Sequence, residues 1–157
     1  MYMLYTLSVF VHILAASAWI GSMIFFAAAV VPVVRRPEYA NVFTDLVRRL
    51  GGRFRIVGWA SLVVLVVTGA CSLGLRGIGL GQLASAGFWS AGFGQTLAYK
   101  LTAVLLVLLA TAAHDVLSAR RNHASSRRLA SLLGRLTLVL SVVVLLLAVW
   151  LVRGMPA

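Results

Sequence analysis

Apolar residues run along this chain in four long stretches that are separated by more polar connections. The stretches are about Leu4–Val34, Ile56–Leu75, Leu97–Ala119 and Leu136–Val152. A helix needs roughly 20 residues to cross the hydrocarbon core of a bilayer, so each stretch predicts a transmembrane helix. Short connections favour antiparallel neighbours. The pattern therefore predicts an all-α integral membrane protein, an up-down bundle of four transmembrane helices that forms a single domain over residues 1–157.

The connection between the first two stretches has a helical pattern of its own. Pro37 and Glu38 suit the first turn of a helix, and apolar residues then recur at helical spacing. They are Tyr39, Val42, Phe43, Leu46 and Leu50. The pair Gly51–Gly52 ends this pattern, so we expect a separate, short amphipathic helix on the membrane surface. The connection at residues 74–96 is glycine-rich and predicts a loop with room for a helical turn.

The distribution of charge predicts the orientation of the bundle. The chain is 62% hydrophobic and 11% charged, with a formal net charge of +11. Eleven of its 14 Lys and Arg residues lie in the first and third connections. The positive-inside rule places these connections in the cytoplasm and both termini outside, as in a bacterial-type inner membrane. Topology thus accounts for the positive charge, and the lipid bilayer rather than nucleic acid is the expected partner.

Two further features limit the class of protein. The N-terminus has no basic residue and the first apolar stretch is about twice as long as a signal sequence, so we expect no cleaved signal peptide. Cys71 is the single cysteine, which excludes an internal disulfide and any cysteine cluster for zinc or iron–sulfur binding. We expect Cys71 to be a small packing residue.

A few polar groups lie within or beside the apolar stretches, where they are costly and tend to mark function. His12, Trp19 and Met23 share one face of the first helix. Lys100 and His114 lie on one face of the third helix, near opposite ends. Hydroxyl groups such as that of Thr68 can bond to their own helix backbone and carry little information. Arg53 lies at the start of the second helix.

Three interpretations of His12 and His114 remain open. Each imidazole can be a packing residue that bonds to a neighbouring helix, a ligand of haem iron, or part of a copper site with thioether sulfur from Met23. At 1.5 Å per residue the two histidines differ in depth by roughly 13 Å, so we do not expect them to share one metal ion. Lys100 and Arg53 either extend towards the interface or pair with haem propionates, with Trp19 beside the cofactor.

The order of several short motifs resembles the copper-resistance protein D (CopD) domain family. The motifs are His12 with Trp19-Ile20-Gly21, Pro32, Arg53-Phe54, Thr68-Gly69, Phe88-Trp89, Gly94, Lys100 and His114-Asp115. The resemblance covers the first three helices and is weak in the fourth. The broader superfamily is similar to HemJ, the haem-associated membrane protoporphyrinogen oxidase, which also has a histidine early in its first helix.

This resemblance implies an inner-membrane protein of copper or haem-copper homeostasis, which binds a metal or haem between helices with His12 as the metal-side ligand. A second hypothesis is a b-type haem redox protein similar to HemJ. A third is an accessory subunit that packs against a larger membrane complex or a second copy of itself. No catalytic residue is assigned, and a role other than catalysis is favoured.

Overall fold

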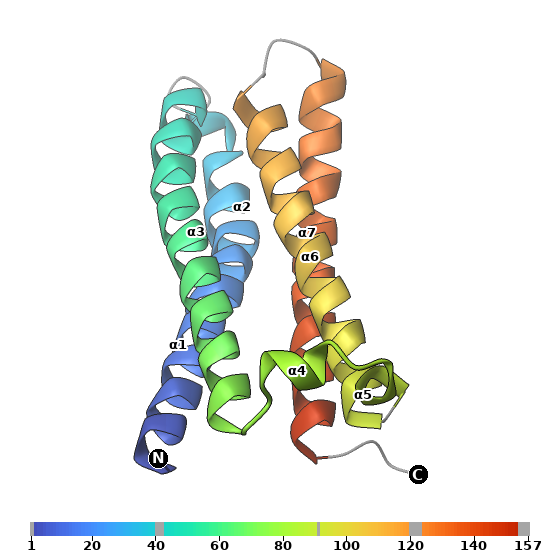
Figure 1. Ribbon diagram of the computed structural model, residues 1–157. Helices are drawn as coiled ribbons and strands as arrows, with labels where there is room; N and C mark the ends of the chain where they lie inside the picture. Colours follow the sequence, from blue (N-terminus) through green and yellow to red (C-terminus); the bar gives the residue numbers. More distant parts are fainter. Residues whose placement is uncertain (1, 40–42, 91, 120–123, 154–157) are drawn as a thin grey trace. The chain divides into compact units, whose positions relative to one another are not determined.

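The structure, a computed structural model, describes residues 2–39, 43–90, 92–119 and 124–153. Every regular element in these ranges is a helix (Figure 1). Four helices within them are long and apolar enough to cross a membrane, and they are Tyr2–Val34, Arg49–Leu75, Gly92–Ser118 and Arg128–Leu151. The predicted class, an all-α integral membrane protein with four transmembrane helices, is confirmed.

The chain divides into two compact units, which we call the first hairpin (Met1–Gly79) and the second hairpin (Leu80–Ala157). The first hairpin contains α1 (Tyr2–Phe25), the π-helical turn η1 (Phe26–Val30), α2 (Val31–Val34), the 3-10 turn η2 (Pro37–Tyr39) and α3 (Phe43–Leu75). The second contains α4 (Leu80–Leu83), α5 (Ala86–Ser90), α6 (Gly92–Ala119) and α7 (Ala124–Arg153).

Within the first hairpin, α1 runs antiparallel to α3. Ser8 near the start of α1 lies against Ser72 near the end of α3, whereas Trp19, further along α1, contacts Gly58. A Cβ atom at Gly58 would lie 2.6 Å from Cζ3 of the Trp19 ring. The indole of Trp19, which is 7% exposed, therefore occupies space that a glycine leaves on the facing helix.

The first long helix continues through Pro32 by widening one turn before it. Residues Phe26–Val30 form a π-helical turn, and Pro32 lies in the first turn of α2. Proline has no N–H to donate and its ring clashes with the carbonyl four residues earlier. A single π turn ahead of the proline relieves both conflicts without ending the helix. Helix α2 then ends at Val34.

The amphipathic segment between the first two transmembrane helices is not a separate helix, which corrects the prediction. Helix α3 runs without a break from Phe43 through Gly51–Gly52 to Leu75. Glycine ends a helix when it turns into the left-handed region, and Gly51 and Gly52 do not. Among the described residues, positive φ occurs at Gly77, where φ is 80°.

Gly77, just after α3, adopts the left-handed conformation that ends a helix, whereas Gly51 and Gly52 do not. The N–H of Ile78 donates to the Leu73 carbonyl at 3.1 Å, and the N–H of Gly77 donates to the Gly74 carbonyl at 2.9 Å. This is the Schellman arrangement, which satisfies carbonyl groups at the end of α3 with a left-handed glycine. Residue 77 thereby fixes the point at which the first hairpin ends.

The helices of the second hairpin are longer than the apolar stretches predict. Helix α6 begins at Gly92 rather than near Leu97, and α7 begins at Ala124 rather than near Leu136. Polar and basic residues such as Arg128 and Arg135 are therefore helical and exposed. Hydropathy marks the part of a helix that crosses the membrane, and a helix continues beyond it when its backbone bonds stay favourable.

The connection at residues 74–96 contains the two short helices α4 and α5 rather than a loop with a single helical turn. Helix α5 lies so close to the start of α6 that a Cβ atom at Gly94 would come within 1.9 Å of the Phe88 carbonyl oxygen. Phe88 also meets Trp89 and Phe93 edge to face, at centroid distances of 5.2 and 6.2 Å. Gly94 is thus required for this aromatic cluster to form.

The contact of Trp19 with Gly58 predicts a large effect of Gly58→Val. A branched side chain there must displace a rigid indole, and overpacking of this kind costs about 2 kcal/mol. We expect a clear fall in Tm, measured by circular dichroism in mild detergent. The matched control is Gly74→Val, because a Cβ atom at Gly74 meets nothing within 4 Å. Equal Tm values for the two variants would contradict the assignment.

Candidate functional site

His12 lies half-buried on α1 and contacts a hydroxyl group of α3. Its Nδ1 atom is 2.8 Å from Oγ1 of Thr68. The same hydroxyl donates to the carbonyl oxygen of Val64 at 2.6 Å. A hydroxyl has a single proton, so at this imidazole it acts as the acceptor and Nδ1–H is the donor. The neutral ring therefore carries its lone pair on Nε2.

The contact of His12 with Thr68 belongs to a row of polar pairs between α1 and α3. The Ser8 hydroxyl donates to the Thr68 carbonyl at 3.1 Å and lies 3.1 Å from the Ser72 hydroxyl. At the end of the hairpin where α1 begins and α3 ends, which we call the open end, Nε of Arg76 donates to the Tyr5 hydroxyl at 2.9 Å. We call these three pairs, Tyr5–Arg76, Ser8–Ser72 and His12–Thr68, the polar ladder.

Sequence reasoning missed most of the polar ladder. It set the hydroxyl of Thr68 aside as one that bonds to its own helix, which is true but incomplete. The available signal was spacing, because Thr68, Ser72 and Arg76 recur every four residues on α3. On α1, Tyr5 and Ser8 lie seven and four residues before His12. Residues at these spacings share one helix face, so each row lies along a single face of its helix.

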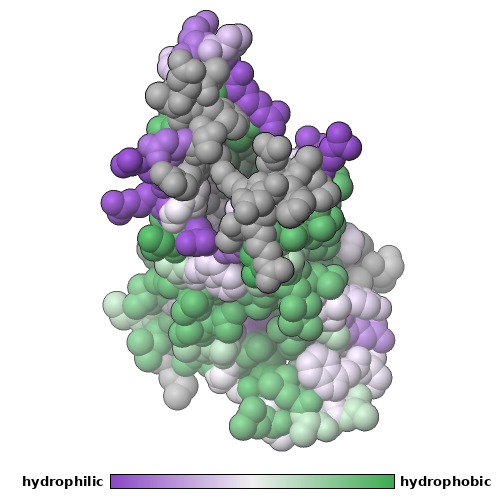
Figure 2. All heavy atoms as spheres, turned by 90° about the horizontal axis from the view of Figure 1, so that it is seen from above, coloured by the Kyte–Doolittle hydropathy of each residue, from purple (hydrophilic) through white to green (hydrophobic). Residues whose placement is uncertain are grey.

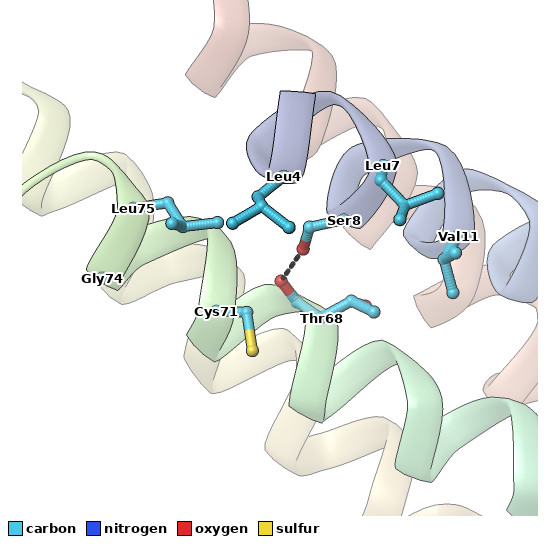
Figure 3. Close-up of a pocket in the computed structure, with 8 residues that line it drawn as sticks. All are labelled: Leu4, Leu7, Ser8, Val11, Thr68, Cys71, Gly74 and Leu75. Atoms are coloured by element: carbon cyan, nitrogen blue, oxygen red, sulfur yellow. Dashed lines mark hydrogen bonds between the residues drawn. The ribbon is translucent and has the colours of Figure 1, made fainter. Parts of the chain in front are cut away.

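A shallow groove lies beside the polar ladder (Figure 3). Its lining comes from α1 and α3 and is mostly apolar, and it comprises Leu4, Leu7, Ser8, Val11, Thr68, Cys71, Gly74 and Leu75. The hydrogen bond between Ser8 and Thr68 crosses the groove. Cys71 is a free thiol at an exposed position on this surface.

The other candidates on the first hairpin lie apart from His12. Met23 is three helical turns further along α1, about 16 Å at 1.5 Å per residue, so the two side chains do not bind one ion together. Trp19 lies between them and packs on Gly58. Arg53 is exposed about three turns into α3, far along the hairpin from Thr68.

The remaining two candidates, Lys100 and His114, belong to α6 of the second hairpin. Lys100 is half-buried near the start of that helix. Nδ1 of His114 donates to the Ala130 carbonyl on α7 at 2.7 Å, and the Ser118 hydroxyl lies 3.4 Å from Nε2. The ring of His114 also rests on Gly134, at 3.5 Å from the position of a Cβ atom. These contacts join α6 to α7, as a packing residue would.

The described residues contain no group of three or more His, Cys, Asp or Glu side chains that could hold a metal ion. A closed copper or zinc site built from such ligands is therefore not formed within those ranges. His12 offers one nitrogen of the right tautomer. This donor set fits a ligand that receives its other bonds elsewhere, such as haem iron or an ion that is passed on.

Comparison with known proteins adds one similarity over nearly the full chain. The chain is 27% identical over 147 residues to an uncharacterized protein of Aquifex aeolicus (strain VF5), across 91% of this chain and 92% of that protein. No protein-family model matches the chain, and no solved structure matches it. The fold defines the chain as a multi-pass helical membrane protein.

The bond geometry around His12 predicts a single tautomer. In bilayers, nitrogen NMR of labelled histidine is expected to show a protonated Nδ1 and an unprotonated Nε2 for this residue. Thr68→Val removes the acceptor, and we expect the preference for the Nδ1–H tautomer to be lost. Thr137→Val is the control, since the Thr137 hydroxyl also donates to its own helix, at 2.8 Å from the Leu133 carbonyl. A His12 spectrum unaffected by Thr68→Val would contradict this tautomer assignment.

Proposed function

We propose that this protein serves copper or haem-copper homeostasis in the membrane, as its resemblance to the CopD family implies, and that Nε2 of His12 is the metal-side ligand. The observation that carries the proposal is the bond between His12 and Thr68. A ligating histidine commonly donates its second ring N–H to a neighbouring acceptor, which fixes both the tautomer and the ring orientation. Thr68 has this position relative to His12.

The small number of ligands favours a transient role for the site. Imidazole is a good ligand for copper ions, and a cargo ion must be bound firmly enough to enter and weakly enough to leave. One imidazole from this hairpin meets that condition better than a closed site. The ion would be cargo, with its other ligands supplied by its donor or acceptor.

The same nitrogen supports a second candidate, a b-type haem protein. An imidazole supplies one axial ligand of haem iron, so one properly oriented histidine is sufficient on this hairpin. Gly69 adds support, because the ring of His12 lies 3.6 Å from the position of a Cβ atom there, and α3 is thin beside the imidazole.

Metal analysis and absorption spectroscopy of the protein purified in mild detergent test the proposal. We expect bound copper after reconstitution with Cu(I), with no Soret band. His12→Ala is expected to abolish the binding. Thr68→Val is expected to weaken it by roughly 10- to 100-fold, the usual effect of removing the group that orients a ligating histidine. Thr137→Val provides the matched control and is expected to bind as the wild type does.

The outcomes separate the candidates. A Soret band that is lost in His12→Ala would contradict the copper proposal and support the haem candidate. Absence of both copper and haem from a well-folded protein would contradict the proposal and leave the accessory subunit. Retention of metal by His12→Ala, with loss in His114→Ala, would move the site to the second hairpin.

We further propose a bacterial-type inner membrane location with both termini outside. The support is the arginine content of the first and third connections, which the positive-inside rule places in the cytoplasm. A C-terminal fusion is therefore expected to give alkaline phosphatase activity and no green fluorescence in a bacterial host. A fusion at Arg36 is expected to give the reverse, and a fluorescent C-terminal fusion would contradict the orientation.

A further inference from the structure

One face of α7 changes from polar to apolar partway along the helix. Successive residues turn by 100°, so residues three or four positions apart share a face. Arg128, Ser131 and Arg135 have these spacings and lie within about 60° of one another around the helix axis. We call these three residues the basic cluster. The same face continues through three apolar residues, which are Val139, Val142 and Leu146.

The side chains of the basic cluster are open to a ligand. Arg128, Ser131 and Arg135 are all exposed, and within the described ranges of the chain neither arginine forms an ion pair. Arg49 on α3 differs, because its Nε atom lies 2.7 Å from Oδ2 of Asp45. Hydrophilic side chains project from the end of the molecule at which α7 begins (Figure 2).

The length of the uncharged part of α7 places Arg135 at the edge of the hydrocarbon. The sequence has no charged residue between Arg135 and Arg153, a distance of roughly 27 Å at 1.5 Å per residue. The hydrocarbon core of a bilayer is about 30 Å thick, and the headgroup layer adds roughly 5–7 Å on each side. Leu132, which is 59% exposed, lies less than one turn before Arg135 and so within that layer. Arg128 lies two turns before Arg135, further towards water.

On the hydrocarbon side of Arg135, the same face is apolar and uncovered within its hairpin. Val139 is 60% exposed, Val142 50% and Leu146 49%. A ligand that fits both parts of this face has an anionic head near Arg135 and an acyl chain along the apolar residues. Phosphate oxygens are strong acceptors for guanidinium N–H groups, and a serine hydroxyl can donate to the same oxygens.

We propose that this face of α7 binds an anionic phospholipid, with the phosphate between Arg128 and Arg135. The Ser131 hydroxyl donates to the same headgroup, and one acyl chain lies along Val139. The two arginines are about 10 Å apart along the axis, and their long side chains reach along the helix surface to one phosphate. Each basic residue near an anionic membrane surface contributes roughly fivefold to binding, so the pair selects an anionic lipid over a zwitterionic one. This site belongs to the second hairpin and does not depend on metal binding at His12.

The test measures lipid at this face of α7 in the full chain, reconstituted in nanodiscs of phosphatidylcholine. Cys71 is the single cysteine, so a fluorophore is placed on Val143→Cys in a Cys71→Ser background, beside the proposed acyl chain. Phosphatidylglycerol with a spin label on its acyl chain is titrated in, and quenching reports its binding. The double variant Arg128→Gln, Arg135→Gln is expected to bind this lipid about 25-fold more weakly.

The matched control is the double variant Arg53→Gln, Arg55→Gln, which removes the same charge from α3. These two arginines are 200° apart around their helix and share no face, so we expect the affinity to change less than fivefold. Equal losses in the two double variants would show attraction by net charge alone and would overturn the proposal. No loss in the α7 variant would overturn it as well.

Two further arms separate charge from folding and a lipid from a free anion. The variant Arg128→Lys, Arg135→Lys keeps the charge and is expected to retain the lipid within about fivefold, with an unchanged Tm in both α7 variants. Equal quenching by spin-labelled phosphatidylcholine would contradict recognition of an anionic headgroup. Displacement of the lipid by inorganic phosphate at equal concentration would also overturn the proposal, because a lipid held by its acyl chain outcompetes a free anion.

Discussion

The Thr68 hydroxyl donates its proton to the Val64 carbonyl, and the chemistry of His12 depends on that donation. With its proton committed at 2.6 Å, Thr68 accepts from the imidazole, and the ring presents Nε2 as a base or a ligand. A neutral imidazole in a membrane helix without a partner would be costly. The bond to Thr68 reduces that cost and fixes the proton of the neutral ring on Nδ1.

Glycines on the facing helices make room for the large polar and aromatic rings. Gly58 faces the indole of Trp19, Gly69 faces the imidazole of His12, and Gly134 faces that of His114. In a membrane, helices gain little from the hydrophobic effect and associate through close packing and hydrogen bonds between helices. An imidazole ring that packs on a glycine lets the two helices approach closely. The same ring also forms a hydrogen bond between the helices. The two hairpins thus use the same device, each with an imidazole that donates from Nδ1 to the opposite helix.

The sequence was sufficient for the class of fold, because hydropathy over some 20 residues reports membrane spans directly. It failed at the first residues of the later long helices, which begin before the apolar stretches do. Gly51–Gly52 resembles a terminator, but termination depends on a left-handed conformation, which Gly77 adopts and this pair does not. The sequence also identified His12 as a candidate residue but did not identify Thr68 as its partner. A pair between two helices depends on their register. Register is set by contacts such as Trp19 on Gly58, which no local pattern contains.

Depth connects the candidate site to the membrane. Thr68 lies two helical turns from Arg76, so His12 is about 12 Å from the open end at 1.5 Å per residue, within the hydrocarbon rather than at its surface. The row of hydroxyl groups between Arg76 and His12 lies over that distance, where water is scarce and each polar group must be paired. A histidine needed only to join two helices could be paired by Thr68 alone. The further pair of Ser8 with Ser72 extends the row of polar side chains from His12 towards Arg76, so the row is longer than the pairing of one histidine requires.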